Sequence, residues 1–116
     1  MGLKSKPKMN IFHVGVELIE FLPVDDEVHR FAAFALSQAL TGGQRLVLDT
    51  VAKRGVVRAM PTSHDVTNAL TYLTKMGYIS ALGNDRYQLT HVGSAIHSAL
   101  KISVEGHAIW YQEERT

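Results

Sequence analysis

The fold is decided by residues 41–100, which read TGGQRLVLDTVAKRGVVRAMPTSHDVTNALTYLTKMGYISALGNDRYQLTHVGSAIHSAL. The apolar spacing, capping residues and turn residues predict a helix, a single helical turn, a second helix, two strands joined by a tight turn, and a third helix. We therefore expect a small α+β, mostly helical domain over residues 41–101.

The first helix of this stretch has a clear start and a clear end. Thr41 and Gln44 have the spacing of a capping box, and Gly55 follows Arg54 as a typical helix stop. Residues 56–60 are too few for a full helix before Pro61. We expect a single helical turn there.

The helix predicted over residues 63–76 has two contrasting faces. Thr62 and Asp65 have the spacing of a second capping box at its start. No acidic residue lies between Asp65 and Asp85, whereas an ordinary surface helix often carries Glu and Lys pairs. Opposite its apolar stripe the helix carries amide, imidazole and hydroxyl groups, on His64, Thr67, Asn68 and Thr71. Such donors and acceptors suit the reading of base edges in a DNA groove; a solvated surface is the alternative.

A hairpin and a last helix complete the stretch. Residues 78–82 and 86–89 are strand-like, and Gly83-Asn84-Asp85 between them supplies turn residues. Thr90 is a suitable cap for a further helix that runs to about Leu100.

The charge of the chain is unevenly distributed. The formal net charge is only +1. Residues 41–101 nevertheless carry seven basic and three acidic side chains, a local balance of +4, whereas residues 9–40 balance to −4 and residues 102–116 to −2. Lys4, Lys6 and Lys8 add positive charge at the start. A basic middle between acidic flanks indicates an anionic partner.

Three segments carry a resemblance to a known family. Residues 40–48 (LTGGQRLVL), 65–79 (DVTNALTYLTKMGYI) and 87–93 (YQLTHVG) resemble parts of winged-helix regulators of the MarR type. In order, these parts are the opening helix, the recognition helix with the first wing strand, and the second wing strand. The linker over 56–62 and the wing turn over 83–85 are shorter than is usual in that superfamily.

The resemblance implies a winged helix-turn-helix protein that binds double-stranded DNA, as a dimeric transcriptional regulator. The base-contact candidates are His64, Thr67, Asn68 and Thr71. The phosphate-contact candidates are Lys53, Arg54, Arg58, Ser63, Lys75 and Arg86. Because winged helices also bind proteins, the alternative is an adaptor or inhibitor module with a protein partner.

The segments on either side of the domain are less regular. Residues 1–8 are interpreted as a disordered basic arm, 9–40 as an N-terminal extension with a packing or dimerisation helix, and 102–116 as a C-terminal tail. Residues 10–22 fit both a helix and a strand, and we favour a helix. Phe31, Phe34, Ile109 and Trp110 are the candidates for a homodimer interface.

A long apolar helix is predicted after Asp25-Asp26-Glu27, whose charges suit a helix start. Because it is apolar over more than half of its circumference, we expect it to be buried on more than one side, with Phe34 well off the main apolar face. Residues 10–22 or a dimer partner would cover the second side. The residues of the expected buried face are Val28, Phe31, Ala32, Ala35, Leu36 and Ala39.

Several function classes receive no support from the sequence. The chain has no cysteine and six histidines without a metal-site spacing, which we expect on the surface. Neither a phosphate-binding loop nor an activated nucleophile is present. We therefore expect no metal, no cofactor and no enzyme activity. No apolar run approaches the ~20 residues that span a bilayer, so we expect a cytoplasmic protein without a membrane partner.

Overall fold

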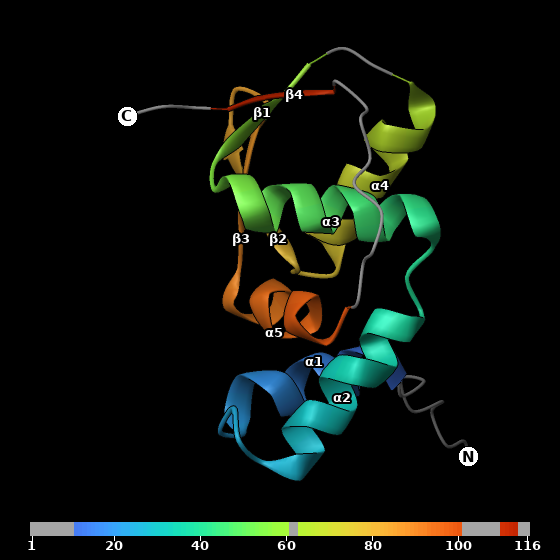
Figure 1. Cartoon of the computed structure of the whole chain (residues 1–116), viewed down its shortest axis with the longest axis vertical. Coiled ribbons are helices and arrows are strands. Elements are labelled where there is room, and N and C mark those ends of the chain that lie inside the picture. Colours follow the sequence, from blue (N-terminus) through green and yellow to red (C-terminus); the bar gives the residue numbers. More distant parts are fainter. Residues whose placement is uncertain (1–10, 61–62, 101–109, 114–116) are drawn as a thin grey trace, which may run out of the picture.

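The computed structural model describes residues 11–60, 63–100 and 110–113. These residues form an α+β, mostly helical fold with a small antiparallel sheet (Figure 1). In chain order the elements are α1 (Ile11–Phe21), α2 (Glu27–Gln38), α3 (Gly42–Arg54), β1 (Val57–Ala59), α4 (His64–Lys75), β2 (Ile79–Gly83), β3 (Arg86–Leu89), α5 (His91–Ala99) and β4 (Tyr111–Glu113).

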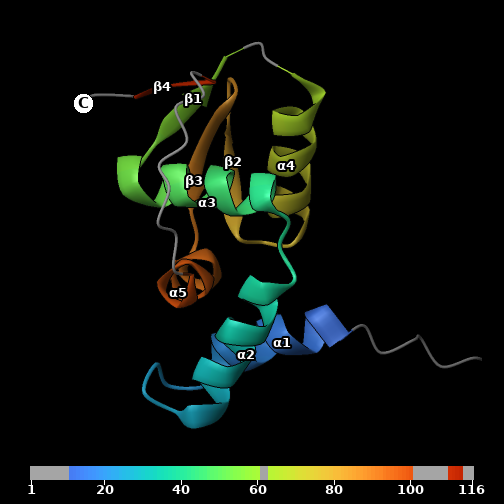
Figure 2. The same cartoon turned by 45° about the vertical axis from the view of Figure 1, so that its right-hand side comes forward.

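Helix α5 lies between the two ends of the molecule. The antiparallel pair of α1 and α2 packs against one side of α5, and α3 packs against another (Figures 1 and 2). The sheet and α4 occupy the end farthest from α1 and α2. One hydrophobic cluster joins these parts, and Ile19, Leu48 and Ile96 are fully buried within it.

The sheet has the strand order β2-β3-β1-β4, and every pairing is antiparallel. The hairpin of β2 and β3 confirms the two predicted strands. Asn84 and Asp85 take φ values of 55° and 60°, as the two central residues of a type I′ turn require. This turn type follows the natural twist of the strands, so a short connection is sufficient.

Local capping signals set the starts of α3 and α5, as expected. The Thr41 hydroxyl accepts a hydrogen bond from the Gln44 amide, and the Gln44 side chain accepts one from the Thr41 amide. The Thr90 hydroxyl accepts from the Gly93 amide. At α4 the expectation was wrong: the N-cap is Ser63, whose side chain makes no capping bond. Thr62 lies outside the described residues.

The prediction of a helical turn over residues 56–60 was also wrong, because Val57–Ala59 forms strand β1. Val57 is buried and Arg58 is exposed, and β1 bonds to β3 on one side and to β4 on the other. Within the described chain, no helix therefore lies between β1 and α4. Strand β1 and helix α4 stand where a single helical turn and a helix were expected.

Residues Ile11–Phe21 are helical, which confirms the favoured reading of that segment. Gly15 makes the close approach of α1 to α2 possible: a Cβ there would lie 3.1 Å from Cδ1 of Leu36.

The buried face of α2 differs from the predicted one. Ala32 and Leu36 are buried as expected, but the rest of the inward face consists of His29, Ala33 and Ser37. Small side chains on this face allow α1 and α5 to pack closely on α2. The expected inward positions Val28, Phe31, Ala35 and Ala39 are exposed.

The end of the chain contributes to the core. Tyr111–Glu113 forms β4 on the free edge of β1, and Trp110 before it is 3% exposed. Because that side chain packs inside the monomer, its assignment to a dimer surface does not hold. Ile109 and the predicted arm over residues 1–8 lie outside the described residues. No helix in the described part of the chain is long and apolar enough to cross a membrane.

Candidate nucleic-acid interface

Helix α4 presents the predicted polar face at the edge of the molecule. Ala69, Leu70 and Leu73 are buried against the core. His64, Thr67, Asn68, Thr71 and Lys75 are exposed. In the view of Figure 2 no other element covers the outer side of α4. The amphipathic spacing of the sequence therefore places the candidate base-contact residues together on an open surface.

The hydrogen bonds of these side chains determine what each can offer. Thr67 Oγ1 donates to the Ser63 carbonyl at 3.3 Å, and Thr71 Oγ1 donates to the Thr67 carbonyl at 2.9 Å. Both hydroxyls then have only acceptor capacity left. The Asn68 carboxamide makes no hydrogen bond to another described residue, so its donors and its acceptor are open to an incoming group.

Two shallow hollows flank this face. One has a volume of about 340 Å³ and lies between the start of α3 and α4, where Asn68 and Asp65 face Gln44. The other, of about 200 Å³, lies between α4 and the hairpin, where Thr67 and Thr71 face Asp85. The outer face of α4 and the tip of the hairpin therefore form one continuous surface.

Two arginines sit opposite each other on neighbouring strands of the sheet. Arg58 of β1 is the register partner of Arg86 of β3, so both side chains leave the same face of the sheet. Arg58 Nη1 donates to the Asn84 carbonyl at 3.2 Å, and Arg86 Nε donates to the Gly83 carbonyl at 3.3 Å. Like charges directly opposite each other on neighbouring strands are unfavourable.

Because residues 56–60 were predicted to be helical, the pairing of Arg58 with Arg86 was not expected. As a helical turn, residues 56–60 would give Arg58 no partner on β3. The sequence signal that would have revealed it is the alternation of Val57, Arg58 and Ala59, which has the period of a strand.

The other predicted phosphate contacts are dispersed. Lys53 and Arg54 lie in the last turn of α3, and that end of α3 points away from α4 (Figures 1 and 2). Lys75 lies in the last turn of α4, and Ser63 is exposed at its first turn. Arg58 and Arg86 lie beside the hairpin turn, on the sheet face opposite to that of Val57 and Tyr87, which pack with the core.

Lys53 belongs to a cluster that joins α3 to α5. Its Nζ lies 3.0 Å from Asp49 Oδ2, and His97 Nε2 lies 2.7 Å from Asp49 Oδ1. Burial raises the pKa of the Asp49 carboxyl, but the hydrogen bonds from His97 and Lys53 outweigh burial and hold that pKa below its ordinary value. The i, i+4 spacing of Asp49 and Lys53 was visible in the sequence, whereas the partner on α5 was not.

Two histidines that were expected on the surface are buried or partly buried. His29 is buried on α2, and His97 is partly buried against Asp49. Within residues 11–60, 63–100 and 110–113, no three histidine, aspartate or glutamate side chains come together as a metal site would require.

Two of the dimer candidates are among several large apolar side chains that α1, α2 and their connection leave exposed. Phe31 is 71% exposed and Phe34 is 53% exposed. We refer to these two side chains, together with exposed Phe21, Val24 and Val28, as the α1–α2 apolar surface. Side chains of this size seldom remain in water together on a monomer, so the surface is suited to contact with another protein chain.

Comparisons of this chain with protein-family models, curated proteins and solved structures gave no match.

Proposed function

We propose that this chain binds double-stranded DNA through the outer face of α4 and the β2–β3 hairpin, in the manner of a winged-helix transcriptional regulator. The observation that carries the proposal is the open face of Asn68 and its neighbours on α4, with the Arg58–Arg86 pair on the sheet that α4 contacts. The sheet order, with β1 next to β3 and the hairpin at one edge, supports the winged-helix arrangement.

In this proposal α4 enters the major groove and reads base edges. The Asn68 carboxamide has both a donor and an acceptor available, which matches the N6 and N7 atoms of adenine. His64 can also donate or accept. Thr67 and Thr71 would accept hydrogen bonds, because their hydroxyl protons are already used within the helix.

Arg58 and Arg86 would hold phosphates on the hairpin side of α4, and Lys75 would do so at the other end of the helix. Phosphate contacts fix the register of a protein on the duplex without reading its sequence. Lys53 contributes less, because Asp49 already neutralises its charge.

A single domain of this size reads few base pairs, so useful specificity favours a homodimer on a two-fold site. The α1–α2 apolar surface is the proposed contact between the two copies. A dimer that occupies its site would regulate transcription by excluding other proteins from that stretch of DNA.

One observation favours a protein partner instead. Asp65 and Asp85 flank the α4 face at its two hollows, and a carboxylate there would repel a nearby phosphate. An adaptor or inhibitor would use the same face against a partner with complementary basic groups. The two proposals differ in whether substitutions on this face change DNA affinity.

Two substitutions test the DNA proposal, after a preferred duplex has been selected from random sequences. We expect Asn68→Ala to lower affinity for that duplex by about tenfold and to relax the choice of one base pair. We expect Arg58→Ala to weaken binding to all duplexes alike and to reduce the salt slope of binding by about one. Fluorescence anisotropy titrations measure both effects.

Arg30→Ala is the matched control, because it removes an exposed cation on α2, far from α4. It should leave affinity unchanged apart from a small salt-dependent loss. If the α4 and β1 variants behaved like this control while the wild-type protein still bound DNA, the proposed placement of the interface would be wrong.

A further inference from the structure

The smaller hollow beside α4, between that helix and the β2–β3 hairpin, is suited to a single side chain of another protein. We refer to it as the Asp85 hollow. Its volume is about 200 Å³, below the range of about 300–1,000 Å³ that small-molecule sites occupy. The apolar part of its lining comes from Ala59, Met60, Leu70 and the ring of Tyr87. A recess of this size and lining can hold the stem of one long side chain, and such anchors dominate many protein interfaces.

The polar side chains of the Asp85 hollow are acceptors, apart from the Tyr87 hydroxyl, which can also donate. The hydroxyls of Thr67 and Thr71 donate their protons to carbonyls within α4, so each offers only oxygen lone pairs. The Asp85 carboxylate forms no hydrogen bond or ion pair with another described residue. None of the described lining residues is basic. An occupant therefore has to bring the donors, and a positive charge suits this lining best.

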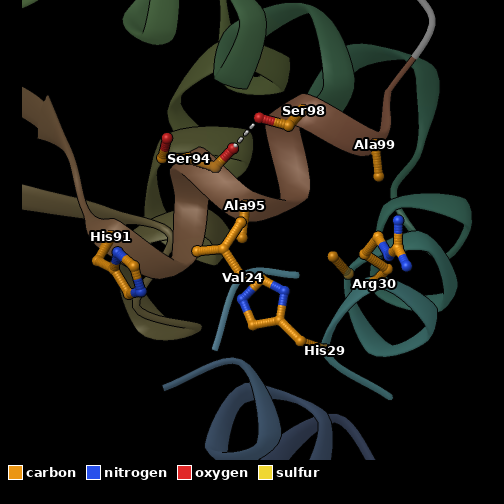
Figure 3. A pocket seen from close by; sticks show the side chains of 9 residues that line it. Val24, His29, Arg30, His91, Ser94, Ala95, Ser98 and Ala99 are labelled. Carbon is orange, nitrogen blue, oxygen red and sulfur yellow. Dashed lines mark hydrogen bonds between the residues drawn. The ribbon is translucent and has the colours of Figure 1, made fainter. Parts of the chain in front are cut away.

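The other pockets of the described structure have a different polar lining. In the pocket between α2 and α5, Arg30 contributes a guanidinium group and His29 and His91 contribute imidazoles (Figure 3). In the second hollow beside α4, Gln44 and Asn68 contribute amide donors. The shortage of donors is therefore a particular property of the Asp85 hollow.

Arginine fits this set of groups better than lysine does. A guanidinium group has five N–H donors in one plane, enough for a carboxylate and two hydroxyl oxygens together. It also stacks on aromatic rings, and Tyr87 lies in the same hollow. Arg58 and Arg86 of the chain itself leave the face of the sheet opposite to that of Tyr87, so they do not fill the hollow.

The backbone at Asp85 indicates that this side chain does not serve the turn. Asp85 has a φ of 60°, and glycine is the favoured residue at this second central position of a type I′ turn. An aspartate there carries a conformational cost that glycine does not. The Asp85 carbonyl accepts a hydrogen bond from the Ala59 amide at 2.7 Å, which joins the turn to β1 through the backbone alone.

We propose that the Asp85 hollow is a docking site for one arginine side chain of a partner protein. The guanidinium group bonds to the Asp85 carboxylate and to the oxygens of Thr67 and Thr71, and the arginine stem packs against Met60. This arginine would anchor the protein partner considered as the alternative function, and its binding does not rest on DNA binding. If DNA does bind α4, a partner seated here would cover Thr67 and Thr71 and compete with the duplex.

Two-dimensional NMR of the full chain tests this proposal with three capped tripeptides, in which glycine flanks arginine, lysine or citrulline. Citrulline has the shape of arginine without its charge. Each peptide is titrated to about 20 mM at constant ionic strength, which detects even millimolar binding. We expect the arginine peptide to shift the amide signals of Thr67, Thr71 and Tyr87. The lysine peptide should bind about twofold to fivefold more weakly, and the citrulline peptide at least about fivefold more weakly.

Two substitutions at Asp85 separate binding from folding. Asp85→Asn keeps the shape of the side chain and its tolerance of a positive φ, and it should weaken binding of the arginine peptide at least about fivefold. Asp85→Gly should weaken binding as much while it raises the midpoint of thermal unfolding, because glycine is favoured in this turn. The matched control is Asp65→Asn, which neutralises a carboxylate in the second hollow beside the same helix. It should bind the arginine peptide within about twofold of the wild-type protein.

Free agmatine distinguishes a protein contact from a small-molecule site, because it carries the same guanidinium group on a short chain. We expect its Kd to be millimolar or weaker. Binding at micromolar Kd would show that the hollow is a small-molecule site, and would contradict the assignment to a partner protein.

Four further results would overturn the proposal. The first is the absence of shifts at Thr67 and Thr71 with the arginine peptide. The second is equal binding of the arginine and citrulline peptides, which would show that charge plays no part. The third is an equal loss of binding in Asp85→Asn and Asp65→Asn, which would place the cation outside the Asp85 hollow. The fourth is a lower unfolding midpoint in Asp85→Gly, which would show that the carboxylate is needed for the fold itself.

Discussion

The single residue Gly93 determines how closely the start of α5 approaches the hairpin. A Cβ at this position would overlap the carbonyl oxygen of Tyr78, which accepts a hydrogen bond from the Thr90 amide. The Thr90 hydroxyl in turn donates to the Gly77 carbonyl at 2.6 Å. Only glycine allows the start of α5 and the start of β2 to approach this closely.

We expect Gly93→Ala to lower the free energy of unfolding by about 3 kcal/mol, because α5 or β2 must move to admit the methyl group. Urea denaturation followed by circular dichroism measures the change. Gly43→Ala is the control: a Cβ there meets nothing within 4 Å, and alanine should stabilise α3 by about 0.5–1 kcal/mol. Equal stabilities of the two variants would contradict this explanation of Gly93.

The glycine at position 93 was visible in the sequence as part of the LTHVG segment, but its physical reason was not. That reason depends on the carbonyl of Tyr78, which lies on another element. The same limit applies to His29. Its residue type is evident from the sequence, whereas its burial follows from how α2 is rotated against α5.

Among the interactions between elements, the hydrogen bond of Asp49 to His97 links α3 to α5. The pKa of Asp49 in the folded chain is below the ordinary value of 3.8. Ionised Asp49 therefore stabilises the fold above about pH 4, and this contribution is lost as the pH falls through the lowered pKa of the folded state. We expect Asp49→Asn to cost about 1–2 kcal/mol at pH 7 and to flatten the acid side of the stability profile.

Denaturant unfolding at a series of pH values between 2 and 7 checks this prediction, with Asp25→Asn as the control for an exposed carboxyl group. The control should follow the wild-type profile. A parallel fall in stability for wild type and Asp49→Asn below pH 4 would contradict the assigned role of Asp49.

The elements could be predicted from the sequence where local signals determine them. Thr41 and Thr90 cap their helices, and Asn84 and Asp85 suit their turn, because these interactions involve neighbours in the chain. Strand β1 was missed because three alternating residues are a weak signal and its hydrogen bonds go to β3 and β4, far along the sequence.

Periodicity alone did not determine the orientation of α2. The helix carries apolar residues around more than half of its circumference, so more than one face could be the buried one. Packing chose Ala33 and Ser37 for the interior and left Phe31 outside. For α4 the polar and apolar faces are distinct, and the candidate face was predicted correctly as exposed.

The two proposed surfaces lie at opposite ends of the whole molecule. The α4 face and the hairpin occupy one end, and the α1–α2 apolar surface occupies the other, with α5 between them (Figure 1). A dimer joined through the α1–α2 apolar surface would leave both α4 faces free.

The measurement that tests the central claim most directly is the binding of the wild-type chain to random duplex DNA at two salt concentrations. Fluorescence anisotropy at about 50 and about 200 mM salt gives the two affinities. We expect binding at about micromolar Kd in low salt and, for a single bound chain, a loss of about fortyfold in high salt, as its three phosphate contacts require. No binding at low salt, or binding that salt does not weaken, would contradict the proposal that Arg58, Arg86 and Lys75 hold DNA.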